Sequence, residues 1–199
     1  MSKPDWTQEL DRREAVKALL TDRTNMLVVT GLGSPTYDVF GAGDHEGNFY
    51  LWGAMGGAAL VGLGLSLAQP RRPVTVVTGD GEQLMGLGGL ATIKVSAAPN
   101  LSIVVLDNGH YGETGGQLSH CGRGLDLVSV VRGIGFPIIL DVDTLSGLER
   151  VRAAIGSITD GPRFVRIRIQ NEDKPRALPA RDGTFLKSRL RTYVGYPVR

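Results

Sequence analysis

Hydrophobic residues are concentrated in five short stretches of the chain, each four to six residues long. These stretches lack the strict apolar–polar alternation of a strand with one exposed face. Such runs are typical of strands covered on both sides, as in a parallel sheet. We therefore expect buried strands at residues 26–29, 74–78, 101–106, 138–142 and 164–169.

The longer segments between these runs predict helices. Within residues 6–20, four apolar positions follow the spacing of one helical face: Leu10, Val16, Leu19 and Leu20. Further helices are expected at about residues 54–68, 82–96, 125–133 and 145–158. Strands that alternate with helices predict an α/β fold, with three layers (α/β/α) around a mostly parallel central sheet.

The carboxyl-terminal end has a different character. We expect one domain over residues 1–170, followed by a loop and basic tail over residues 171–199. From residue 163 onward there are ten Lys or Arg against three Asp or Glu, which favours a solvated or subunit-covering segment over one that binds an anionic partner. Five apolar tail residues are candidate docking points: Phe185, Leu186, Leu190, Tyr193 and Tyr196.

Composition excludes some classes of protein. A net charge of +2 gives no bias toward nucleic acid or membranes, and 42% hydrophobic residues are enough for a core. The single cysteine, Cys121, allows no internal disulfide, and the first residues contain no apolar run typical of a secretion signal, so a cytoplasmic protein is expected. Residues 51–68 are uncharged, but five glycines among them favour a buried helix over a membrane span.

Polar side chains follow two of the predicted strands. Asp80 lies between two glycines after strand 74–78, and Asn108 follows strand 101–106. Ligands of parallel sheets bind at the carboxyl ends of the strands, so these side chains converge if the two strands are neighbours. Carboxylate, amide and backbone oxygens suit Mg²⁺ or Ca²⁺, which predicts a divalent metal site.

The same region also suits a phosphate group. Gly79 and Gly81 allow a tight turn, and the helix that follows offers free N–H groups and its positive end. An earlier loop reads Gly31-Leu32-Gly33-Ser34-Pro35, where Ser34 is expected to cap a helix with Pro35 in its first turn. Thr36 stands where a third glycine would complete GxGxxG, which argues against a nicotinamide site.

The spacing of 28 positions from Asp80 to Asn108 resembles the fingerprint of thiamine diphosphate enzymes. Specifically, "FYLWGAMGGAALVGLGLSLA", "GDGEQLMGLGGLATI" and "LDNGHYGETGGQ" resemble the sulfopyruvate decarboxylase β subunits and the C-terminal half of the phosphonopyruvate decarboxylases. The resemblance implies the diphosphate-binding (PP) domain of that family. The family's usual Asn-Asn pair is Asp107-Asn108 here, which keeps the second, metal-binding asparagine.

The resemblance implies roles for individual residues. Asp80, Asn108 and the backbone carbonyl of His110 would ligate Mg²⁺. Met55 would separate the two rings of a bent cofactor, next to the Gly53 carbonyl, which would accept from its aminopyrimidine. The implied cofactor-binding residues are Gly33, Ser34, Gly53, Met55, Gly79, Asp80, Gly81, Glu82, Asn108, His110 and Tyr111.

The implied reaction is the non-oxidative decarboxylation of a 2-oxo acid to an aldehyde, with the cofactor as the electron sink. Residues in loops near the metal site are candidates for facing the substrate: His45, Glu113, Thr114 and Gln117. His45 has an alternative interpretation as a turn residue of its polar loop. No Arg or Lys can be assigned from the sequence to an anionic substrate tail.

The family also requires a glutamate that activates the pyrimidine ring, and it comes from a separate PYR domain. This chain has room for one such domain, so the resemblance implies a PYR-domain (α) partner subunit and a hetero-oligomer such as α2β2. Two alternatives remain open at this point. One is a carboligase like acetolactate synthase, and the other is a non-catalytic cofactor-binding subunit that stabilises or regulates its partner.

Overall fold

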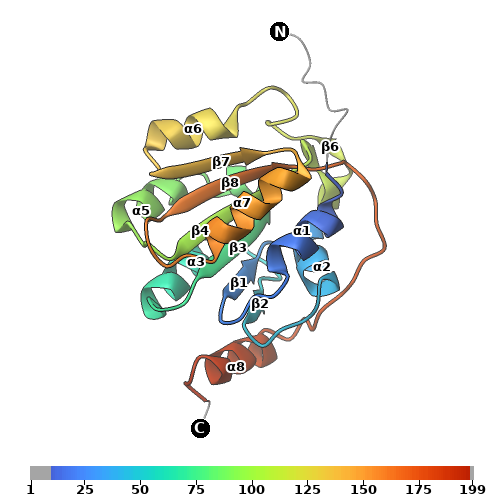
Figure 1. The fold of residues 1–199 in the computed structure, drawn as a ribbon. Helices are drawn as coiled ribbons and strands as arrows, with labels where there is room; N and C mark the ends of the chain where they lie inside the picture. Colours follow the sequence, from blue (N-terminus) through green and yellow to red (C-terminus); the bar gives the residue numbers. More distant parts are fainter. Residues whose placement is uncertain (1–9, 198–199) are drawn as a thin grey trace.

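A computed structural model of the chain describes residues 10–197 and shows a central sheet between two layers of helices (Figure 1). The six strands are all parallel and lie in the order β2-β1-β3-β4-β8-β7. In chain order they are β1 (Leu27–Thr30), β2 (Asn48–Tyr50), β3 (Val74–Gly79), β4 (Leu101–Asp107), β7 (Ile138–Val142) and β8 (Arg163–Arg168). The three-layer parallel α/β architecture expected from the sequence is confirmed.

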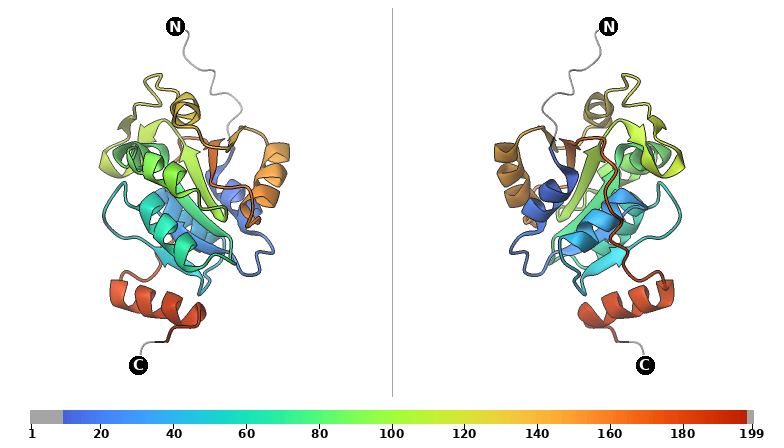
Figure 2. Two further views of the ribbon diagram at one scale, coloured as in Figure 1. Left: turned by 90° about the vertical axis from the view of Figure 1, so that its left-hand side faces the viewer. Right: turned by 90° about the vertical axis from the view of Figure 1, so that its right-hand side faces the viewer.

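The helices divide between the two faces of the sheet (Figure 2). One face is covered by α1 (Arg12–Leu20), α2 (Ser34–Gly41) and α7 (Leu145–Ile155). The other face is covered by α3 (Ala58–Ala68), α5 (Gly89–Ser96) and α6 (Leu127–Ile134).

Successive residues of one strand enter different cores, because their side chains point to opposite faces of the sheet. In β3, Val76 belongs to the core beneath α3, whereas Val77 belongs to the core beneath α1 and α2. Both residues are fully buried. Two buried faces therefore account for the continuous apolar runs of the sequence.

Two predicted helices start later than the sequence suggests. The segment 6–20 becomes helical only at Arg12, because the Asp11 carboxylate accepts from the N–H groups of Arg13 and Glu14 and so forms the cap. Residues 6–9 lie outside the described part of the chain. The segment 54–68 is irregular before α3 begins at Ala58.

The predicted helix 82–96 is wrong as a single element. It forms α4 (Asp80–Met85) and α5, separated by a glycine-rich turn. A Cβ on Gly86 would lie 2.1 Å from the Gly56 carbonyl oxygen, so two backbones approach each other closely at the break. Ser34 is also not a cap: it is the first residue of α2, and Gly33 takes the capping position with a φ of 82°.

The sequence did not predict β2 or the helix near the C-terminus. β2 is a three-residue edge strand, too short to stand out. Helix α8 (Gly183–Tyr193) packs against β2. Its Leu186 belongs to the core on the face covered by α1, α2 and α7, with 1% of its surface exposed. Phe185 and Tyr196, two of the predicted docking points, remain largely exposed.

A loop over residues 171–182 joins the end of β8 to α8 and passes along the rim of the sheet (Figure 1). It is held to its own chain by polar contacts. Lys174 pairs with Asp11, the Trp52 indole donates to Ala180 O at 2.8 Å, and on α8 Arg189 pairs with Asp44. Part of the tail's positive charge is therefore neutralised within the chain.

Within residues 10–197, no helix combines the length and the apolar character that a membrane crossing requires.

The packing of α3 against β3 can be tested with two glycines of α3. A Cβ on Gly62 would lie 2.2 Å from Cγ2 of Val76, a stiff, buried side chain, whereas Gly64 is exposed with nothing within 4 Å. We expect Gly62→Ala to lower the free energy of unfolding of the isolated chain by about 1–3 kcal/mol through overpacking. Gly64→Ala should raise it by up to about 1 kcal/mol through helix propensity. Urea unfolding measures both, and effects of the same sign would contradict the packing described.

Candidate cofactor site

A cleft opens at the carboxyl edge of the sheet, and its empty space of about 660 Å³ includes space open to solvent. β3 and β4 are neighbours in parallel register, with Gly79 opposite Leu106, so Asp80 and Asn108 leave the sheet at the same edge. The condition for their convergence is thus met. Most residues predicted from the sequence line this cleft: Ser34, Met55, Gly79, Asp80, Gly81, Glu82, Asn108, His110, Tyr111, Glu113 and Thr114.

Four predicted residues do not line the cleft. Gly33 lies beside it, since a Cβ there would lie 2.5 Å from Cγ of Glu113. Gly53 lies in an exposed part of its loop, and Gln117 is an exposed residue whose amide donates to Thr114 Oγ1 at 3.1 Å.

His45 is the clearest difference from the sequence-based expectation. It precedes β2, whereas the cleft follows the ends of the parallel strands, so it lies at the opposite edge of the sheet. Its ring packs edge-on against Tyr193 of α8, and its Nδ1 accepts from Gly47 N. His45 therefore does not face this cleft, and the interpretation as a turn residue fits its surroundings.

Asp80 is buried with 1% of its surface exposed. Its carboxylate accepts a hydrogen bond from Ser119 Oγ, which in turn accepts from Gly122 N at 3.2 Å. Burial and the nearby negative charge of Asp107 raise the pKa of Asp80. Ser119 is fully buried, and sequence reasoning missed it because it lies in a loop 39 positions further along the chain.

Asp107, which replaces the family's first asparagine, also lies in this buried region. Carboxylate oxygens of Asp80 and Asp107 and the thiol of Cys121 all lie within 4.8 Å of one another. Burial raises the pKa of the Asp107 carboxyl, although the Arg166 guanidinium, 3.9 Å away, acts in the opposite direction.

Arg166 on β8 offsets the negative charge of several carboxylates at once. Its Nε donates to Asp141 Oδ1 at 2.9 Å, and its Nη1 lies 3.5 Å from Asp126 Oδ1. The Arg166 side chain is 9% exposed, whereas Asp141 and Asp126 are 38% and 53% exposed, so Asp107 is the one fully buried carboxylate of this group. An aspartate at position 107 is tolerated because this guanidinium lies on the neighbouring strand.

The Asn108 loop is a compact turn. Asn108 Oδ1 accepts from the His110 N–H at 3.0 Å, and His110 Nδ1 donates to Asn108 O at 2.7 Å. Gly109 has a φ of 67°, which brings the two residues together. The Asn108 amide donates to Asn171 at 3.2 Å, which attaches the tail to this loop.

Tyr111 covers the Gly79-Asp80-Gly81 turn. A Cβ on Gly81 would lie 2.4 Å from the Tyr111 ring, so glycine is required there for steric reasons. The Tyr111 hydroxyl is 2.9 Å from His120 Nδ1, which fixes the ring from its far end.

The Glu82 side chain joins two other loops of the cleft. It is 3% exposed, its Oε1 accepts from Gly56 N at 3.3 Å, and a Cβ on Gly31 would overlap its Oε2. Burial raises the pKa of this carboxyl. Oε2 has no hydrogen-bond partner among residues 10–197. Glu82 thus connects the first βα loop to the loop that carries Met55.

Comparisons with known proteins agree with this geometry. Residues 41–168 match the family "Thiamine pyrophosphate enzyme, C-terminal TPP binding domain". The chain is 38% identical to the sulfopyruvate decarboxylase subunit beta of Methanothermobacter thermautotrophicus over 83% of this chain and 86% of that protein. It is 37% identical to the phosphonopyruvate decarboxylase of Streptomyces viridochromogenes over 85% of this chain, but spans only 42% of that protein.

A solved structure shares the fold. The 2-oxoglutarate:ferredoxin oxidoreductase of Magnetococcus marinus superposes with a TM-score of 0.65 at 18% identity, over 90% of this chain and 74% of that one. The chain therefore belongs to the thiamine pyrophosphate (thiamine diphosphate) enzymes, as a TPP-binding domain of their C-terminal type. Within that family it is homologous to the sulfopyruvate decarboxylase β subunits and to the phosphonopyruvate decarboxylases.

Two arginines of β8, Arg166 and Arg168, allow a test of the charge compensation around Asp107. Arg166→Met leaves three carboxylates without their shared cation and should lower the free energy of unfolding by about 3–5 kcal/mol. Arg168→Met removes a more exposed, 3.8 Å pair and should cost less than about 1 kcal/mol. Guanidinium unfolding gives both values.

Asp107→Asn in the Arg166→Met background should recover part of that stability, because one of the uncompensated charges is gone. If the double variant is as unstable as Arg166→Met or less stable, Arg166 does not compensate Asp107.

Proposed function

We propose that this chain is the diphosphate- and magnesium-binding subunit of a heteromeric thiamine diphosphate-dependent 2-oxo acid decarboxylase that releases an aldehyde. Its homology to sulfopyruvate and phosphonopyruvate decarboxylases supports the substrate class, a 2-oxo acid with a second anionic group. The observation that carries the proposal is the convergence of the Asp80 carboxylate and the Asn108 amide at one cleft.

The residues at this edge fit the cofactor. The proposed metal ligands are the Asp80 carboxylate, the Asn108 amide oxygen and the His110 carbonyl, a set of hard oxygens that suits Mg²⁺. The proximity of the Asp80 and Asp107 carboxylates favours a divalent cation, since its charge would offset their repulsion. Glycines at 79 and 81 and the start of α4 leave backbone N–H groups for a diphosphate.

When bound, thiamine diphosphate supplies the electron sink for decarboxylation. In the proposed arrangement, Met55 and the Gly53 carbonyl orient the ring end of the cofactor. Glu82 fixes the Met55 loop through Gly56. Glu113 and Thr114, which line the cleft, remain candidates for contact with substrate.

A partner is part of the proposal. The relative from Methanothermobacter is called a subunit beta, and this chain spans less than half of the phosphonopyruvate decarboxylase it matches. We infer that a PYR-domain (α) subunit supplies the activating glutamate in an α2β2 or larger assembly. Helices α3 and α4 expose apolar side chains that would suit such a contact: Leu60, Val61, Leu67 and Met85.

Calorimetric titration of thiamine diphosphate with Mg²⁺ tests the binding role. We expect weak binding by the chain alone, strong binding together with the co-purified partner, and loss of about 100-fold or more in affinity for Asp80→Ala, because a metal ligand is removed. Asp22→Ala, an exposed carboxylate at the other edge of the sheet, is the matched control and should bind normally. Tight binding by the chain alone would contradict the split site.

The reaction itself is tested by product analysis with sulfopyruvate, phosphonopyruvate and pyruvate. A free aldehyde supports the decarboxylase, and a hydroxyketone would mean a carboligase on the same scaffold. Full turnover by the partner without this chain would indicate a non-catalytic subunit.

Ser119 provides a further test through Asp80. Removing a hydrogen-bond partner of a metal ligand commonly costs 10–100-fold in metal affinity. We expect Ser119→Ala to weaken Mg²⁺-dependent cofactor binding by about that factor while the fold is kept. Ser129→Ala, which removes a hydrogen bond to Asp126 at the start of α6, should leave binding unchanged. An equal loss in both variants would point to general destabilisation instead.

A further inference from the structure

One charged side chain on the wall of the cleft was not anticipated from the sequence. Arg12 of α1 lines the cleft and is 4% exposed. Of its N–H donors, Nη1 donates to Asp38 Oδ2 at 3.1 Å, and the buried Nε has no partner among residues 10–197. A guanidinium has five N–H donors, so much of the hydrogen-bonding capacity of Arg12 remains unused.

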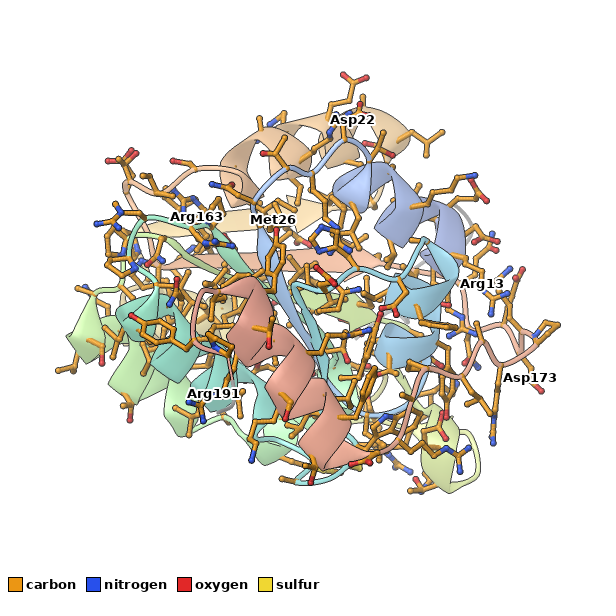
Figure 3. The ribbon with its side chains drawn as sticks, turned by 90° about the horizontal axis from the view of Figure 1, so that it is seen from below. Arg13, Asp22, Met26, Arg163, Asp173 and Arg191 are labelled. Atoms are coloured by element: carbon orange, nitrogen blue, oxygen red, sulfur yellow. The ribbon has the colours of Figure 1, made fainter. Side chains whose placement is uncertain are left out.

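Arg12 shares its buried carboxylate partner with a second arginine. Asp38 is fully buried and pairs with two arginines, through Oδ2 to Arg12 and through Oδ1 to Arg13 at 3.2 Å. One carboxylate between two guanidiniums leaves a net charge of +1. Arg13 is 29% exposed, lies at the rim beside the segment that carries Asp173 (Figure 3), and donates to Pro175 O. Arg12 is 4% exposed and lines the cleft.

Charge in the cleft is otherwise negative. Within the described residues, Arg12 is the single Lys or Arg on the lining, and the carboxylates are those of Asp80, Glu82, Glu113 and Glu172. Glu172 is paired with Lys174 and Glu113 with Arg176, whereas Asp80 and Glu82 have no paired cation in the described part of the chain, so Arg12 is the lining side chain that attracts an anion. A guanidinium with free donors matches the geometry of a phosphoryl group.

Arg12 lies apart from Met55, the residue proposed to contact the rings of the cofactor. α1 and α2 cover one face of the sheet and α3 covers the other, so Arg12 and Met55 approach the carboxyl edge from opposite faces. Arg12 instead lies with Ser34 and Pro35, at the N-terminus of the eight-residue helix α2. Pro35 has no N–H, so the N–H groups without an intrahelical partner there are those of Ser34 and Thr36.

We propose that Arg12, together with the N-terminus of α2, binds the terminal phosphate of the diphosphate, at the end of the cleft opposite Met55. This inference rests on the proposed cofactor function and adds a binding residue to it. In this arrangement Asp38 is a positioning residue, since it holds Arg12 in place through an ion pair. The metal would neutralise the diphosphate at Asp80 and Asn108, and Arg12 would neutralise its outer end.

The test compares three ligands that differ only in their phosphates: thiamine diphosphate, thiamine monophosphate and thiamine. Each is titrated with Mg²⁺ into the full chain together with its partner subunit. Arg12→Gln should raise the Kd of thiamine diphosphate by about 10- to 100-fold, the worth of a charged hydrogen bond, and leave that of thiamine within about twofold. Arg12→Lys should recover part of the affinity, because it keeps the charge without the planar fork.

Arg13→Gln is the matched control, since it removes an arginine from the same Asp38 without altering the cleft. It should change the affinity for thiamine diphosphate by less than threefold. If Arg12→Gln folds poorly, Arg12→Gln/Asp38→Asn removes the buried charge pair as a whole and should show the same loss of selectivity for the diphosphate. In ³¹P NMR of the bound cofactor, Arg12→Lys should shift the terminal phosphorus resonance more than the inner one.

Several outcomes would overturn the inference. An equal loss for thiamine and thiamine diphosphate would mean that Arg12 supports only the shape of the site. An equal effect of Arg13→Gln would assign the loss to the charge of Asp38. A raised KM for the 2-oxo acid with unchanged cofactor affinity would assign Arg12 to the substrate. If the wild-type complex binds no thiamine diphosphate, the proposed function fails and this inference fails with it.

Discussion

The structure depends on the burial of two carboxylates, Asp80 and Asp107, at the ends of adjacent parallel strands. Removing charge from water is costly unless it is compensated. Here the compensation comes from Ser119 on one side and from Arg166 on the other. In the proposed function a bound cation would complete this compensation, and the ligand-free chain would then be the less favourable state. Cofactor binding and stability of this edge are therefore coupled in the proposed function.

The sequence predicted most of the sheet because burial on both faces leaves continuous apolar runs, and β3 and β4 are of this kind. It also predicted that Asp80 and Asn108 converge if their strands are neighbours; the strands are neighbours and both residues line one cleft, whereas their binding roles stay a prediction. β2 was missed because an edge strand of three residues leaves no pattern. The break between α4 and α5 was missed for another reason: it depends on the contact of Gly86 with Gly56, thirty positions earlier.

Residues that reach the site through tertiary contacts could not be predicted from the sequence either. Ser119 and Arg166 reach the site from distant segments, and nothing in their local sequence marks them. Arg12 belongs to an ordinary amphipathic helix, where an arginine reads as a solvated residue. His45 is the opposite case, since it does not line the cleft. Its residue type suggested chemistry, but its position before β2 places it at the other end of the sheet.

Helix α8 has a consequence for how this chain can associate. Exposed edge strands invite pairing with another chain, and β2 is an edge strand of the sheet. α8 packs along β2, and Arg189 bonds both the Asp44 carboxylate and the Asn48 carbonyl. The chain thus carries its own protection against uncontrolled strand addition at this edge. Residues 171–182 connect α8 to the rim of the cleft, where Asn171 contacts Asn108. A proteolytic cut in this loop would therefore separate the helix that covers β2 from the loop that borders the cleft.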